Sequence, residues 1–134
     1  MANKLYPKGK EHFATGGINF TGDNIKCILV TSGYTPNFTT DEFLSVISGG
    51  NIVATSGNLA SKSATLGVLN AAALVFTAVS GSTVTQVVMY KDTGTSSTSP
   101  LLAYWDTATG LPVTPNGGDI TLTWDTGSNK IAVI

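Results

Sequence analysis

The sequence contains very little charge. Only 11% of its 134 residues are Asp, Glu, Lys or Arg, whereas an ordinary soluble domain carries about 25%. The net charge of −1 provides no field that would concentrate phosphate, which argues against nucleic acid as a partner. Serine, threonine, asparagine and glycine replace the missing charges, and these residues favour turns. The composition therefore predicts a turn-rich, uncharged exterior.

Cysteine and histidine are scarce, and each occurs once. Because Cys27 has no second cysteine, the chain cannot form an internal disulfide, and a zinc site would lack its usual thiolate ligands. Cys27 lies among apolar residues, so we expect a small buried side chain there. His12 is far in sequence from Cys27 and from any serine in the context of a nucleophile. We expect a surface or partly packed histidine.

The acidic residues and the glycines follow no ligand-binding pattern. Asp and Glu do not form an Asp-x-Asp loop closed by a glutamate, as a calcium site requires. Gly49-Gly50 and Gly117-Gly118 lack the spacing and the lysine of a phosphate-binding loop. The sequence therefore predicts no metal, no cofactor and no catalytic residue, and we expect the protein not to be an enzyme.

Long apolar runs are also missing. The segment Met1–Pro7 lacks the apolar core of a secretory signal. No stretch reaches the roughly 18 uninterrupted apolar residues of a spanning helix. We expect synthesis in the cytoplasm without export, and no membrane partner.

The N-terminal segment, residues 1–16, is predicted to be a helix or arm. Lys4–Ala14 mixes apolar and charged residues and ends at Gly16-Gly17, which suits a short amphipathic helix with a glycine stop. Ile18–Phe20 and Ile25–Val30 flank a polar turn and predict a β-hairpin.

A second short helix is predicted by a capping pattern. Thr39 precedes Glu42 by three residues, so a threonine hydroxyl and a glutamate carboxylate can satisfy the first amides of a helix reciprocally. The apolar run Phe43–Ile47 follows directly, and Gly49-Gly50 would end the helix.

Short apolar or alternating runs recur from Ile52 onward at the spacing of a sandwich or barrel. In Ile120–Trp124 three apolar residues alternate with two threonines, which is typical of a strand with one dry face. The predicted strands are Ile52–Thr55, Ala64–Leu69, Ala73–Thr77, Val84–Tyr90, Leu101–Trp105, Ile120–Trp124 and Lys130–Val133. We therefore expect residues 1–134 to form one mainly β domain, an antiparallel β-sandwich of jelly-roll or immunoglobulin-like type.

Two Asp-Thr-Gly triplets match the active-site motif of aspartic proteases. They are Asp92-Thr93-Gly94 and Asp125-Thr126-Gly127, and two aspartates that share a proton could activate a water. A pepsin-like enzyme needs two lobes, however, and a retroviral-type enzyme needs an apolar segment before and after its triplet. Asp-x-Gly also closes a turn after a strand, because aspartate accepts from the backbone while glycine takes positive φ. We favour the turn interpretation.

Several strings of the sequence are distinctive. They are Met1–Tyr6 and Lys8–Glu11 at the start, and Tyr90–Thr95, Ser99–Tyr104 and Thr107–Ile120 in the second half. Together they resemble a group of small tailed-bacteriophage proteins encoded among virion-assembly genes. The resemblance implies a virion structural protein, a capsid decoration or cement protein on the outer surface of the particle. Its implied partners are the assembled shell of the major capsid protein and other copies of itself, as a homotrimer at local threefold positions.

A tail or fibre component is the alternative. Trp105 and Trp124 each end a predicted strand, where tryptophan is usually the edge of a core. Exposed together with Tyr104, they would instead form a receptor-binding or carbohydrate-binding face.

The shell contact is expected near the N-terminus. Its lysines and a mobile helix would become ordered on binding. The predicted contact residues are Lys4, Leu5, Tyr6, Lys8 and Lys10.

Overall fold

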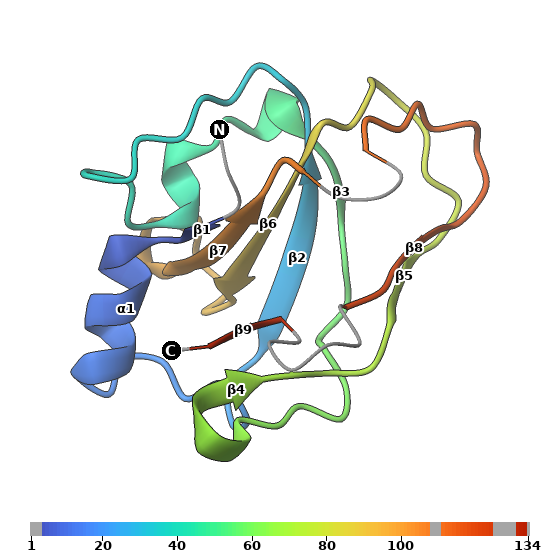
Figure 1. Cartoon of the computed structure of the whole chain (residues 1–134). Coiled ribbons are helices and arrows are strands. Elements are labelled where there is room, and N and C mark those ends of the chain that lie inside the picture. The colour runs from blue at the N-terminus through green and yellow to red at the C-terminus, as the bar shows by residue number, and fades with distance from the viewer. Residues whose placement is uncertain (1–3, 108–110, 125–130, 134) are drawn as a thin grey trace.

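A five-stranded antiparallel sheet is the framework of the computed structural model, which describes residues 4–107, 111–124 and 131–133 (Figure 1). Its strands, in order across the sheet, are β1 (Lys4–Leu5), β7 (Leu101–Trp105), β6 (Gln86–Lys91), β2 (Ile25–Val30) and β3 (Ile52–Thr55). All neighbouring pairs are antiparallel. The predicted strands at 25–30, 52–55 and 101–105 are confirmed at both ends, and the one predicted at 84–90 is shifted to 86–91.

Two short antiparallel ribbons lie over one face of this sheet. They are β4 (Val68–Leu69) with β9 (Ala132–Val133), and β5 (Leu74–Phe76) with β8 (Ile120–Leu122). The alternation predicted for residues 120–124 is confirmed, since the apolar side chains are half-buried against the core and the threonines are exposed. The chain is thus mainly β and consistent with a β-sandwich. The predicted strand at 64–69 is shorter, and Lys130 lies outside the described residues.

The main core fills the space between the sheet and the ribbons. Cys27, Leu29 and Met89 contribute from the sheet, while Leu69 and Phe76 contribute from the ribbons. Cys27 is fully buried, as predicted, and burial raises the pKa of its thiol.

The opposite face of the sheet is covered by an irregular segment, residues 31–51. This segment contains two 3₁₀ turns, η1 (Leu44–Val46) and η2 (Gly49–Asn51). Its residues Tyr34 and Ile47 pack against Ile28 and Val88 of the sheet in a second apolar cluster. The sheet is therefore buried on both faces, which explains the apolar run 27–30 in β2.

Helix α1 (Pro7–Ala14) lies beside the β1 edge of the sheet (Figure 1). The sequence prediction placed its start at Lys4, which is wrong: Lys4 and Leu5 pair with β7 instead. The following proline explains the difference, because it disfavours helical geometry at Tyr6, whose φ and ψ are −66° and 127°. Gly9 allows close packing, since a Cβ atom there would collide with the backbone carbonyl oxygen of Leu101.

The predicted hairpin at 18–20 and the predicted capping box are both corrected by the structure. Residues 18–20 form no strand, because the Asn19 N–H donates to the Asp23 carboxylate at 2.7 Å and closes a turn. The helix predicted after Thr39 is only η1, which begins at Leu44 with Phe43 as its N-cap residue and no side-chain cap. Phe43 is held extended by a bridge to Pro100, which prevents one continuous helix from Thr39 to Ile47.

Candidate functional site

The first Asp-Thr-Gly triplet forms a turn, as we interpreted it. The Gly94 N–H donates to Asp92 Oδ1 at 2.9 Å, and Gly94 has a φ of +89°. The other carboxylate oxygen of Asp92 pairs with the Lys26 ammonium at 2.7 Å. Hydrogen bonds from Lys26 and from the Gly94 backbone hold the pKa of Asp92 below its ordinary value. The second triplet, 125–127, lies outside the described residues.

A second charged cluster anchors the loop before β2. Lys91 Nζ lies 3.1 Å from Asp23 Oδ2 and donates to the Gly17 carbonyl at 2.8 Å. The Lys62 ammonium donates to the backbone carbonyl of Asp23, and burial lowers the pKa of this lysine. Partial burial opposes the ionisation of Asp23, but the Asn19 N–H and the Lys91 ammonium outweigh it and lower its pKa. These charged groups therefore bind one another and the backbone of their own chain.

His12 joins α1 to the segment that covers the sheet. Its Nε2 atom lies 2.9 Å from Glu42 Oε1, and its ring lies 5.7 Å from that of Phe43 between centroids. His12 is partly buried, as we expected for a packed histidine. The glutamate predicted to cap a helix thus binds the histidine instead.

Metal ligands do not gather anywhere in residues 4–107, 111–124 and 131–133: no group of three or more His, Cys, Asp or Glu side chains there could hold an ion. Within the same residues, no helix has the length and apolar character needed to span a membrane.

A buried chain of hydrogen bonds runs from the N-terminus to the covering segment. The hydroxyls of Tyr6 and Tyr34 are 2.8 Å apart, and the Tyr34 hydroxyl donates to Asp41 Oδ2 at 2.7 Å. The Asn37 N–H donates to the same oxygen at 2.9 Å. Burial raises the pKa of both tyrosines and raises that of Tyr104, which packs edge-on against them, to about 12.

The predicted N-terminal contact residues separate into surface and interior positions. Lys4 and Lys10 are exposed, with Lys4 Nζ 4.9 Å from the Phe38 ring centroid, while Lys8 pairs with Glu11 at 3.3 Å. Leu5 is half-buried against the main core. The Tyr6 side chain is 0% exposed, so it belongs to the fold and cannot touch a partner.

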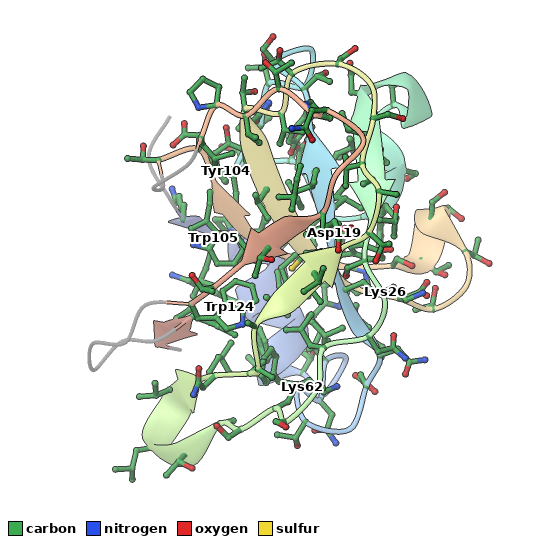
Figure 2. All side chains as sticks on the ribbon, turned by 90° about the vertical axis from the view of Figure 1, so that its right-hand side faces the viewer. Lys26, Lys62, Tyr104, Trp105, Asp119 and Trp124 are labelled. Carbon is green, nitrogen blue, oxygen red and sulfur yellow. The ribbon has the colours of Figure 1, made fainter. Side chains whose placement is uncertain are left out.

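The two tryptophans lie together, but Tyr104 does not join them (Figure 2). The rings of Trp105 and Trp124 are 5.7 Å apart between centroids and tilted by 43°. The Trp124 indole N–H donates to the Ala72 carbonyl oxygen at 3.1 Å. Both rings are half-buried against the main core, whereas Tyr104 lies in the cluster on the opposite face of the sheet. The predicted three-aromatic face is therefore incomplete.

Among the described residues, the most exposed large apolar side chain was not predicted to be exposed. Leu66 is 94% exposed and lies at the tip of the 3₁₀ turn η3 (Thr65–Gly67). Its φ of +55° is in the left-handed region, followed by +77° at Gly67. Leu66 was included in a predicted strand, and only the adjacent glycine signals a turn at this position.

Comparison of the sequence with protein-family models and with curated proteins gives no match.

Proposed function

We propose that the protein is a non-enzymatic structural component of a tailed bacteriophage, a capsid decoration protein that binds the assembled shell of the major capsid protein from outside and stabilises it. The resemblance of the opening and of the 90–120 region to virion proteins supports this function. The observation that carries it furthest is that four of the few charged side chains, in the Lys26–Asp92 and Lys91–Asp23 pairs, bind one another within the chain. The remaining exterior is rich in exposed threonine.

A neutral exterior suits contacts that are repeated many times in one assembly. Copies that sit side by side on a lattice accumulate like-charge repulsion if each carries a strong net charge, and this chain carries −1. A protein that binds only the assembled state stabilises that state by mass action. Several weak contacts per oligomer raise the overall affinity through avidity. A homotrimer would place three such contacts at a local threefold position.

Co-sedimentation with purified shells tests the proposal. The protein should sediment with assembled shells of the major capsid protein, should not bind its unassembled subunits, and should raise the temperature at which the shells disrupt. Equal binding to free subunits, or no binding to shells, would contradict the decoration function. Sedimentation equilibrium of the isolated protein tests the homotrimer.

The N-terminal lysines remain the proposed shell contact from the sequence, and the structure sets how to test them. Deleting residues 1–15 would remove β1 and the buried Tyr6, so lost binding would report unfolding. Replacing Lys4, Lys8 and Lys10 together by glutamine removes the charges, and we expect the fold to be retained because none of the three side chains is buried. We expect weaker shell binding from this variant and normal binding from the matched triple arginine variant. Unchanged binding by the glutamine variant would place the contact elsewhere.

The tail or fibre alternative rests on the Trp105–Trp124 pair, whose rings are each partly accessible. A glycan array probed with the isolated protein distinguishes the two functions. Sugar binding that is lost in Trp105→Ala would favour a receptor-binding face and contradict the decoration function.

A further inference from the structure

The covering segment, residues 31–51, is one long loop whose two ends are joined. The Thr31 N–H donates to the Asn51 carbonyl oxygen at 2.9 Å, and the Thr31 hydroxyl donates to Asn51 Oδ1 at 3.0 Å. The strands that precede and follow the loop, β2 and β3, pair with each other. A loop with joined ends is a compact unit of its own. The covering segment can therefore open without separating β2 from β3.

The loop closes over an apolar face of the central sheet. Ile28 and Val88 of this face are each 0% exposed, and the cost of exposing them to water opposes opening. Gln86 has the opposite effect. Its side-chain N–H groups donate to the Thr31 and Tyr34 carbonyl oxygens, at 2.6 and 2.9 Å, but its Oε1 atom is buried and accepts no hydrogen bond from the described residues. An acceptor in this state favours the open loop, in which water reaches it.

The β1–α1 segment, residues 4–14, contacts the loop at two separate places. At the first, the Tyr6 hydroxyl lies 2.8 Å from that of Tyr34, and the Tyr6 ring lies 5.3 Å from that of Phe38 between centroids. At the second, His12 Nε2 lies 2.9 Å from Glu42 Oε1. The segment is itself fixed to the sheet, because β1 pairs with β7. Residues 4–14 therefore tie both halves of the loop to the sheet.

The backbone of the loop has few other attachments. Residues 32–41 form no backbone–backbone hydrogen bond with residues outside the loop in the part of the chain that the structure describes. The second half is attached through two such bonds, both of 2.8 Å, from the Leu44 N–H to the Ser99 carbonyl oxygen and from the Leu101 N–H to the Glu42 carbonyl oxygen. Segments with few bonds to the rest of a domain open at a lower free energy than its central strands. The side-chain contacts with residues 4–14 therefore matter most where the backbone is least attached.

We propose that the β1–α1 segment is a clasp that holds the loop closed through Tyr34 and Glu42, and that the loop opens as one cooperative unit while the rest of the domain stays folded. The loop is thus a lid over the apolar face that carries Ile28 and Val88. The contacts that carry this inference all lie within one chain, so it is independent of the proposed decoration function.

Native-state hydrogen exchange of the full chain tests the clasp. In the wild type, the Asn37 and Leu44 amides of the loop should exchange faster than the paired amides of β2 and β6. Tyr6→Phe and His12→Ala each remove one hydrogen bond to the loop, so each should speed exchange of the loop amides about fivefold. Because the loop opens as a unit, Tyr6→Phe should speed exchange at Leu44, and His12→Ala should speed exchange at Asn37, although each change lies at the other contact.

Ser56→Ala is the matched control, because it removes one buried hydrogen bond, from the Cys27 N–H to Ser56 Oγ at 2.9 Å, away from the loop. It should speed exchange of the paired amides of β2 and β6, which exchange through global unfolding, and leave the loop amides unchanged. If Ser56→Ala speeds the loop amides equally, the loop opens only when the whole domain unfolds, and the proposal is wrong. It is also wrong if Tyr6→Phe leaves Leu44 unchanged, since the two halves of the loop then open separately.

Discussion

Replacing Tyr34 by phenylalanine removes one hydroxyl from the buried chain that joins Tyr6 to Asp41. Asp41 is 8% exposed, and its Oδ2 atom then keeps only the Asn37 N–H of its two donors. A hydrogen bond to a charged group contributes about 1.5 to 3 kcal/mol, and an orphaned buried hydroxyl on Tyr6 adds about 1 kcal/mol. We expect a loss of about 2.5 to 4 kcal/mol in the free energy of unfolding.

Differential scanning calorimetry and urea denaturation measure this loss. A domain of this size changes its melting temperature by about 3 °C per kcal/mol, so Tyr34→Phe should melt about 7 to 12 °C lower. Tyr6→Phe is the control: it removes only the neutral bond between the two tyrosines and should cost about 1 kcal/mol. If Tyr34→Phe melts within about 2 °C of the wild type, or if Tyr6→Phe is the more damaging change, Asp41 does not depend on Tyr34.

Gly9→Ala should lower the melting temperature by about 3 to 9 °C, because the new Cβ atom would collide with the Leu101 carbonyl oxygen. A higher melting temperature would mean that the greater helix propensity of alanine, about 1 kcal/mol, outweighs the collision. In an alkaline titration followed at 295 nm, the folded protein should show little tyrosinate at pH 10, since burial raises the pKa of all four tyrosines. The raised values favour the folded state below pH 10, and this stability is lost as the pH rises through them; tyrosinate formation at pH 10 without unfolding would contradict the burial. The lowered pKa of Asp92 stabilises the fold above about pH 4. The free energy of unfolding should therefore fall less steeply on acidification in Asp92→Asn than in the wild type. Equal dependence on pH in the two proteins would show that the pair with Lys26 contributes nothing to stability.

The strands of the central sheet were predictable because their signal is local. Ile25–Val30 and Leu101–Trp105 are rich in β-branched or large apolar residues and are bounded by turn residues, so period and composition agree. The sheet is also buried on both faces, so its strands are apolar runs that differ clearly from the polar segments around them. The turn at Asp92 was predictable for the same reason, since its geometry depends on residues two positions apart.

The errors arose where a distant residue overrides a local preference. Thr39 and Glu42 satisfy the capping pattern, yet Glu42 binds His12 and Phe43 is bridged to Pro100. Ile18 and Phe20 are apolar like strand residues, but they are buried as loop residues over the main core. Leu66 is apolar like a strand residue, but its positive φ places it in the turn η3.

The pairing of β1 with β7 has a consequence for how the chain folds. The register joins Lys4 to Tyr104, and β2 pairs with β6 across most of the intervening sequence. Such non-local pairing gives a high contact order, and domains of this kind fold in milliseconds to seconds. During synthesis the first strand must wait for residue 104 to emerge, so the N-terminal helix is among the last elements to dock. A fully paired sheet can therefore form only after most of the chain has been made.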